Sequence, residues 1–145
     1  MNSYINEIIE AAKLTGTEYY VLSKEEANQY IKQVLDKFNP QKTQGHLSIY
    51  NNSVSLPVNE YEFTYSRHLP QEPAYIFFDQ VNKKDTVIKI SNAQKTGELL
   101  LQCSGMEYFL SNEASTYLIA VNWYVVEGAG EALQWMEPLG ATSIE

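Results

Sequence analysis

Residues 106–126, MEYFLSNEASTYLIAVNWYVV, decide the fold that this sequence predicts. Two apolar runs flank the turn-forming residues SNEAS at 111–115, an arrangement typical of a β-hairpin. Because strand side chains alternate between the two faces of a sheet, the second run, 116–126, presents apolar side chains on both faces. Such a strand usually lies in the middle of a sheet, with a layer packed over each face. We therefore expect this hairpin at the centre of an antiparallel sheet.

The second run is too long for an ordinary strand. Its eleven residues would extend roughly 37 Å at about 3.4 Å each, whereas strands commonly contain about 5 to 6 residues. We therefore expect a bend or bulge at 120–122. A buried helix is the alternative for an apolar run, but β-branched and aromatic residues dominate this one, which favours a strand. Residues 128–136, which follow it, are expected to form a loop with at most two helical turns.

Two amphipathic helices precede the strands. The first begins at the capping residue Ser3 and ends at Gly16, with apolar residues at three- and four-residue spacing. The second begins with a capping box formed by Ser23 and Glu26 and ends before Pro40. Its apolar residues form one stripe, which predicts that this face is buried in the core. The stripe consists of Ala27, Tyr30, Ile31, Val34, Leu35 and Phe38.

Short strand patterns and one further helix occupy the middle of the chain. The strand patterns lie at 47–50, 54–56, 61–65, 74–79 and 85–90. The first two and the last two have the spacing of hairpins. A short helix that is capped by Ser91 or Asn92 is expected to end at Gly105.

The order of these elements predicts the fold class. Two helices come first and most of the strands follow, which is typical of an α+β fold. We expect one domain over 1–145: an antiparallel β-sheet with two N-terminal helices and one short helix between hairpins, the helices lying mainly on one face. A domain of 145 residues buries roughly two thirds of its unfolded surface, which is enough for a stable core.

The cysteine content and the N-terminus predict a cytoplasmic protein. Cys103 has no second cysteine with which to form an internal disulfide, and a four-cysteine zinc site is excluded. The first residues are acidic and amphipathic, without the basic region and apolar core of a signal peptide. No run approaches the roughly 18 apolar residues of a transmembrane helix, so we expect no membrane association.

Charge is distributed unevenly along the chain, whose net charge is −8. Residues 1–95 hold 10 Lys and Arg against 11 Asp and Glu, whereas 96–145 hold seven Glu and neither Lys nor Arg. Because phosphate contacts need basic side chains, this composition argues against nucleic-acid binding by the C-terminal part. It favours a basic protein partner, or an acidic surface that serves solubility alone.

Few residues could support catalysis or bind a metal ion. His46 and His68 are the only histidines and match no zinc motif, so we expect neither a metal nor a cofactor. Cys103 with a histidine could form a nucleophile and base, and Glu127 with Glu131 could form an acid pair on one helical turn. A buried inert thiol and an exposed acidic loop are the alternatives. We therefore assign no catalytic residue.

Aromatic and acidic residues gather in the C-terminal third of the sequence. Aromatic side chains anchor protein interfaces, and acidic groups around them steer a basic partner. A core position is the alternative for a tryptophan in an apolar strand such as Trp123. The residues that we select as partner-binding are Glu113, Trp123, Tyr124, Glu127, Glu131 and Trp135.

In overall character the chain resembles the small immunity proteins of bacterial polymorphic and contact-dependent toxin systems. The shared features are one acidic α+β domain, 11 tyrosines and no catalytic motif. The resemblance implies a non-enzymatic protein-binding module that neutralises a basic toxin domain through acidic and aromatic surface residues. No motif assigns functional residues by correspondence. Two alternatives stay open, a small hydrolase or transferase and a small-molecule-binding domain with a tyrosine-lined pocket, and the oligomeric state is open as well.

Overall fold

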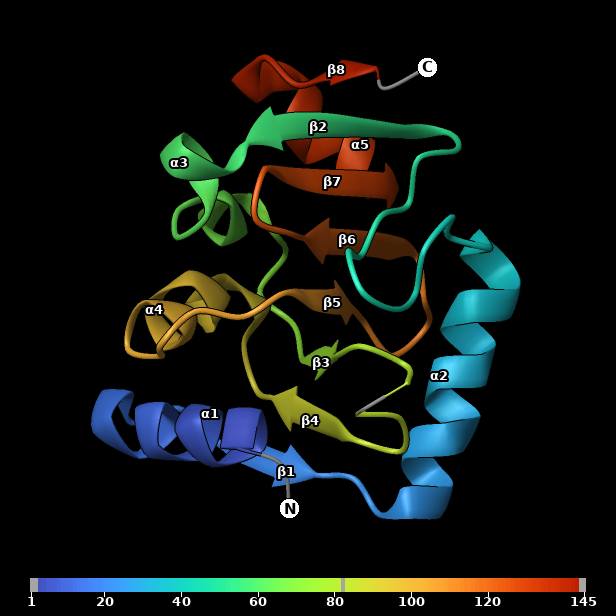
Figure 1. Cartoon of the computed structure of the whole chain (residues 1–145). Helices are drawn as coiled ribbons and strands as arrows, with labels where there is room; N and C mark the ends of the chain where they lie inside the picture. The colour runs from blue at the N-terminus through green and yellow to red at the C-terminus, as the bar shows by residue number, and fades with distance from the viewer. Residues whose placement is uncertain (1–2, 82, 144–145) are drawn as a thin grey trace.

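An eight-stranded antiparallel sheet is the central element of the structure, a computed structural model that describes residues 3–81 and 83–143 (Figure 1). The strand order is β1-β4-β3-β5-β6-β7-β2-β8. The strands are β1 (Tyr19–Val21), β2 (Ser53–Pro57), β3 (Ala74–Phe77), β4 (Val87–Ile90), β5 (Tyr108–Ser111), β6 (Tyr117–Val121), β7 (Val125–Gly130) and β8 (Thr142–Ser143). The α-helices are α1 (Ser3–Thr15), α2 (Lys24–Phe38), α3 (Val58–Tyr61), α4 (Thr96–Leu101) and α5 (Ala132–Met136). Turns of 3-10 helix lie at Tyr65–His68, Ala93–Lys95 and Glu137–Leu139.

The predicted central hairpin is confirmed by β5 and β6, the fourth and fifth strands across the sheet. Tyr108 pairs with Val121 and Leu110 with Ile119, and every residue of both strands is buried. Alternate side chains of the two strands enter a separate apolar cluster on each face. The apolar character of both faces in the sequence therefore reflects a sheet that is covered on both sides.

The expectation that 116–126 forms one bent strand is wrong. β6 ends at Val121, the chain reverses, and β7 begins at Val125. Asn122 fixes the reversal, because its Oδ1 accepts hydrogen bonds from the amides of Tyr124 and Val125 at 2.8 and 2.9 Å. Asparagine favours such side-chain-to-backbone turns. The one amide side chain in the apolar run therefore ends a strand instead of marking a bulge.

Three other local predictions are wrong. The predicted loop at 128–136 begins as strand, because its first three residues belong to β7 and pair with neighbouring strands, whereas the predicted one or two helical turns are confirmed by α5. Residues 61–65 continue from α3 into a 3-10 turn instead of a strand. The predicted hairpin between 47–50 and 54–56 is replaced by pairing of β2 with β7 and β8, because side chains of the sheet bind the backbone of the first of these two segments.

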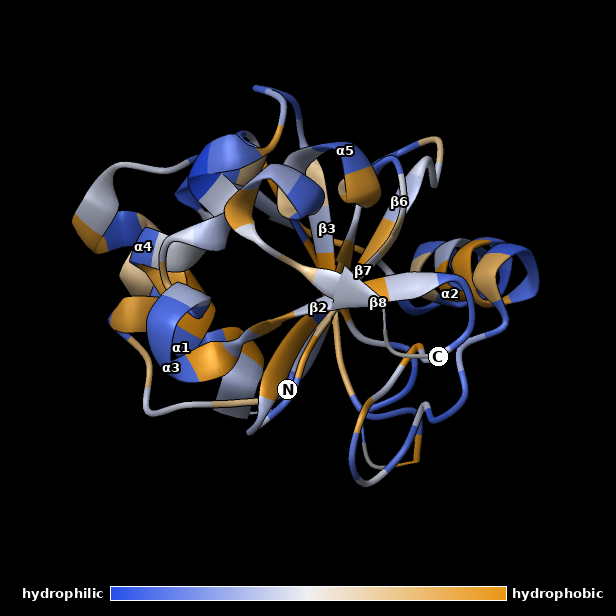
Figure 2. Cartoon of the chain, turned by 90° about the horizontal axis from the view of Figure 1, so that it is seen from above, coloured by the Kyte–Doolittle hydropathy of each residue, from blue (hydrophilic) through white to orange (hydrophobic). Residues whose placement is uncertain are grey.

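Helices cover both faces of the sheet (Figure 2). α1, α4 and α5 bury apolar residues on one face, whereas α2 and its stripe, which includes Ala27 and Val34, pack on the other. The helices thus lie mainly on one face, as predicted, with the longest helix on the opposite face. The capping box of Ser23 and Glu26 at the start of α2 is confirmed. Within the described residues, no helix combines the length and apolar character needed to cross a membrane.

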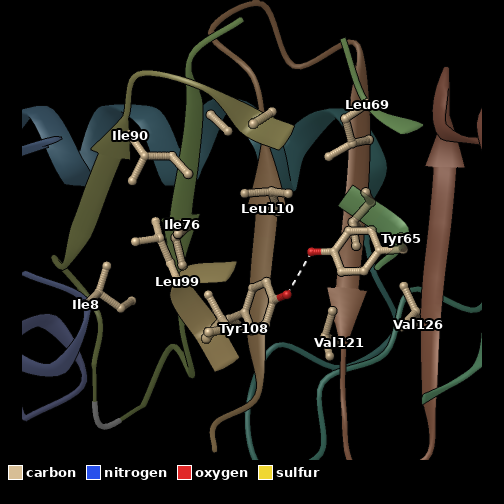
Figure 3. Packing of buried hydrophobic residues seen from close by; sticks show 14 of the residues in the cluster. Ile8, Tyr65, Leu69, Ile76, Ile90, Leu99, Tyr108, Leu110, Val121 and Val126 are labelled. Atoms are coloured by element: carbon tan, nitrogen blue, oxygen red, sulfur yellow. Dashed lines mark hydrogen bonds between the residues drawn. The ribbon is translucent and has the colours of Figure 1, made fainter. Parts of the chain in front are cut away.

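Buried tyrosines add polar atoms to the larger core. The hydroxyls of Tyr65 and Tyr108 lie 2.7 Å apart and share a hydrogen bond between the 3-10 turn and β5 (Figure 3). Ile76, Leu99 and Leu110 are other members of the same buried cluster. Because each of the two hydroxyls finds its partner inside the core, both tyrosines are buried without an unsatisfied polar group at this point.

Candidate partner-binding site

The segment 41–52 joins α2 to β2 and crosses the face of the sheet that α2 also covers (Figure 1). Leu47 and Ile49 of this segment are fully buried and belong to the core on that face. Alternate amides along 45–49, those of Gly45, Leu47 and Ile49, each donate a hydrogen bond to a side chain of the sheet or its ends. We call residues 45–49 the docked segment.

Three carboxylates hold the docked segment, and each comes from a different strand or strand end. Asp79, just after β3, accepts the first of these bonds at 2.6 Å. Glu107, just before β5, accepts the second at 2.8 Å, and Glu127 of β7 accepts the third at 2.5 Å. Hydrogen bonds to charged groups contribute about 1.5–3 kcal/mol each. This carboxylate clamp (Asp79, Glu107 and Glu127) therefore fixes a segment that has almost no regular strand pairing.

The Glu127 side chain is buried and binds the docked segment, so it is not available to contact a partner. It is 4 % exposed and also accepts hydrogen bonds from the Ser48 hydroxyl at 3.2 Å and the Tyr50 amide at 3.3 Å. The expectation of an acid pair or exposed acidic loop formed with Glu131 is therefore wrong. Glu127 lies within a strand under the docked segment, whereas Glu131 is exposed just before α5.

Trp123 and Tyr124 form the tip of the β6–β7 turn, where they are 56 % and 72 % exposed. The core position considered for Trp123 is therefore wrong, because the residue lies in a turn and not in a strand. The Tyr124 ring meets the His46 ring edge to face, with 5.3 Å between the centroids. The Asn122 side chain also donates to the carbonyl of Leu47 at 2.9 Å, which ties the turn to the docked segment. We call Trp123 and Tyr124 the aromatic turn.

A pocket of about 200 Å³ lies beside the aromatic turn. Its lining consists of Tyr4, Gly45, Leu47, Asp79, Lys83, Glu107 and Trp123. The Nζ atom of Lys83 lies 4.5 Å from the centroid of the Tyr4 ring, a cation–π contact. The Nδ1 atom of His46 lies 3.5 Å from Oε2 of Glu107. Aromatic rings and two carboxylates of the clamp thus meet in one hollow at the end of the sheet.

The remaining residues predicted from the sequence lie elsewhere. Glu113 is in the β5–β6 turn, at the opposite end of β6, where its carbonyl oxygen accepts a hydrogen bond from Gln33 at 2.9 Å. Trp135 lies in α5, half-buried, with its ring centroid 5.2 Å from that of Tyr117. Of the six selected residues, the structure brings together the two of the aromatic turn and separates them from Glu113, Glu131 and Trp135.

Sequence reasoning missed most residues of this site, among them Tyr4, His46, Asp79, Lys83 and Glu107. One signal for two of them was present, since Asp79 ends the apolar run 74–79 and Glu107 begins the run into β5. β3 and β5 are antiparallel neighbours, and Phe77 pairs with Phe109. The end of one strand and the start of the other therefore lie at the same end of the sheet.

Cys103 does not have the surroundings of a catalytic thiol. Its Sγ donates to the carbonyl of Leu99 at 3.4 Å. Burial, together with the negative charge of Glu7, raises the pKa of the Cys103 thiol from 9.0 to about 11. A nucleophilic cysteine needs a lowered pKa or an adjacent base. His46 lies instead beside Glu107, so the pairing of His46 with this thiol finds no support.

We expect iodoacetamide to alkylate Cys103 slowly at pH 7.5. Because the thiolate reacts and the pKa is raised, the rate should climb about tenfold per pH unit and level off only near pH 11. Mass spectrometry of the intact protein measures the rate, with a small-molecule thiol as the control. A rate that levels off below pH 8 would contradict the assignment of an inert thiol.

Among residues 3–81 and 83–143, no group of three or more His, Cys, Asp or Glu side chains is placed to hold a metal ion. No protein-family model matches the chain, and neither a curated protein nor a solved structure matches it. The aromatic turn, the carboxylate clamp and the pocket are therefore the features from which a function can be inferred.

Proposed function

We propose that this protein is a non-enzymatic protein-binding module whose interface is centred on the aromatic turn. The observation that carries the proposal is the exposure of two adjacent large aromatic side chains, Trp123 and Tyr124, on a fixed turn. Tryptophan and tyrosine dominate the binding energy of protein interfaces. Because Asn122 already holds the turn, a partner would bind it with little loss of conformational entropy.

The charge of the protein favours a basic partner. The net charge is −8, and residues 96–145, which include the aromatic turn, contain neither Lys nor Arg. The negative electrostatic field that results from this charge steers a positively charged protein toward the surface and raises the rate of association. An immunity protein that neutralises a basic toxin domain in the bacterial cytoplasm combines this charge with an aromatic anchor, and we propose that role for the chain.

An enzyme function, and small-molecule binding in the pocket beside the aromatic turn, have weaker support. The raised pKa of Cys103 opposes nucleophilic catalysis, and Glu127 lies within a strand instead of forming an acid pair. The pocket beside the aromatic turn has a volume of about 200 Å³, below the roughly 300–1,000 Å³ of pockets that enclose drug-sized ligands. These features favour a surface that binds a protein.

Capture from the native host's lysate tests the proposed function. We expect the tagged protein to retain a basic protein in stoichiometric amount at about 0.1 M salt and to release most of it at 1 M. Over that range the Debye length falls from about 10 to about 3 Å, which screens exposed charges. Mass spectrometry and densitometry identify and quantify the captured protein. Capture of an acidic protein, or retention that salt does not change, would contradict a basic partner.

A further inference from the structure

The pocket beside the aromatic turn already accommodates a positive charge. Lys83 places its ammonium 4.5 Å from the centre of the Tyr4 ring, so one aromatic wall of the pocket is in contact with a cation. The carboxylates of Asp79 and Glu107 line the same pocket, and Lys83 is the one basic residue in that lining. The lining thus carries one negative charge more than it carries positive charge.

Partial burial of the Glu107 carboxylate strengthens the negative electrostatic field in the pocket. The Glu107 side chain is only 12 % exposed, so water screens its charge less than that of a surface glutamate. The clamp holds both carboxylates in place, because each accepts a hydrogen bond from an amide of the docked segment. A cation that entered the pocket would meet fixed negative charges and would not have to order flexible side chains.

The size and walls of the pocket select one kind of cation. A volume of about 200 Å³ is below that needed for a drug-sized ligand and suits a single side chain. Trp123 supplies an indole ring, the best aromatic partner for a cation, to the same lining as the carboxylates of Asp79 and Glu107. The planar guanidinium of arginine stacks on aromatic rings and forms two parallel hydrogen bonds to a carboxylate, whereas an ammonium makes cation–π contacts without stacking and lacks the planar fork for two parallel hydrogen bonds.

We propose that the pocket is the receptor for one arginine side chain of the basic partner, which packs against Trp123 and pairs with Glu107 and Asp79. This inference rests on the proposed function, since the arginine belongs to the protein that the aromatic turn binds. It assigns separate roles to the two halves of the site. The exposed faces of Trp123 and Tyr124 provide contact area, and the pocket provides recognition of a charged, planar group.

Titration of the ¹⁵N-labelled protein with N-acetyl-arginine amide tests the pocket without the partner. We expect a saturable shift of the Trp123 indole N–H resonance and none at Trp135, which lies in α5 and serves as the internal control. N-acetyl-citrulline amide has nearly the same shape without the charge and should bind at least tenfold more weakly. Equal binding of the two probes, or the lack of a saturable shift at Trp123, would overturn the proposal.

Two test variants and one control variant show where the probe binds. Glu107→Gln keeps an acceptor oxygen for the Leu47 amide and should weaken the probe at least fivefold. Glu98→Gln, on the surface of α4, is the matched control and should leave probe binding unchanged. Trp123→Ser, followed at the Gly45 and Leu47 amide resonances because the indole is absent, should also remove binding. Because the Trp123 side chain is exposed, this substitution leaves the docked segment intact. Equal probe affinity in all three variants would contradict the assigned pocket.

Binding of the captured partner to the same variants distinguishes failure of this inference from failure of the proposed function. Loss of partner binding in both Trp123→Ser and Glu107→Gln supports the arginine receptor. Loss in Trp123→Ser alone would overturn the receptor and leave the protein-binding function standing. Partner binding that survives both substitutions would overturn the proposed function together with the inference.

Discussion

The double substitution Trp123→Ser, Tyr124→Ser is expected to weaken binding of the captured partner at least 100-fold. Anchor residues of protein interfaces commonly contribute about 2 kcal/mol or more each when truncated, and about 2.7 kcal/mol corresponds to a factor of 100 in Kd. Isothermal titration calorimetry of the purified pair measures the change. The unfolding free energy should stay within about 0.5 kcal/mol of the wild type, because exposed side chains contribute little to stability.

Leu14→Ser is the matched control for this experiment. Leu14 is 77 % exposed on α1, so its substitution removes a comparable exposed apolar side chain outside the proposed interface. We expect the Kd of the control to stay within about twofold of the wild type. A smaller loss in the double variant than in Leu14→Ser would contradict the interface at the aromatic turn.

Glu127→Ala is expected to lower the free energy of unfolding by about 3 kcal/mol. The substitution leaves the buried amide of Ile49 and the donors at Ser48 and Tyr50 without their acceptor, and a buried polar group that loses its partner costs about 1–3 kcal/mol. For a chain of this size, a loss of about 3 kcal/mol lowers Tm by roughly 6–12 °C. Urea denaturation followed by circular dichroism measures the free energy, and calorimetry measures Tm.

Glu131→Ala provides the comparison for Glu127→Ala. Both substitutions remove one glutamate, within β7 or directly after it, but Glu131 is exposed, so its loss should change the unfolding free energy by less than about 0.5 kcal/mol. Equal effects of the two substitutions would mean that the hydrogen bonds to the docked segment do not stabilise the fold.

Local signals account for what could be predicted from the sequence. The capping box of Ser23 and Glu26 defined the start of α2 from two residues three positions apart, and most of the predicted turn residues, 112–115, separate β5 from β6. Both features depend on neighbours in the sequence, so they can be recognised without knowledge of the tertiary structure. The apolar character of both faces of 116–126 likewise indicated a central position in the sheet.

Contacts between distant parts of the chain account for what was missed. Glu127 follows an apolar run and has the appearance of an exposed acid, yet its main donor is the Ile49 amide, 78 residues earlier. Glu107 binds the Leu47 amide across 60 residues. No periodicity within one segment reveals such pairs. The β6–β7 turn was missed for a different reason, since Asn122 supplies the turn without the glycine or proline that usually marks one.

The central claim is that the aromatic turn is the surface that binds a protein partner. Amide hydrogen exchange of the protein, with and without its captured partner, tests this claim most directly. We predict that the partner slows exchange in peptides that cover 122–126 and the docked segment, 45–49, and leaves peptides from α2 and β1 unchanged. Slowed exchange that is confined to α1, α2 or β1, with 122–126 unchanged, would contradict the claim.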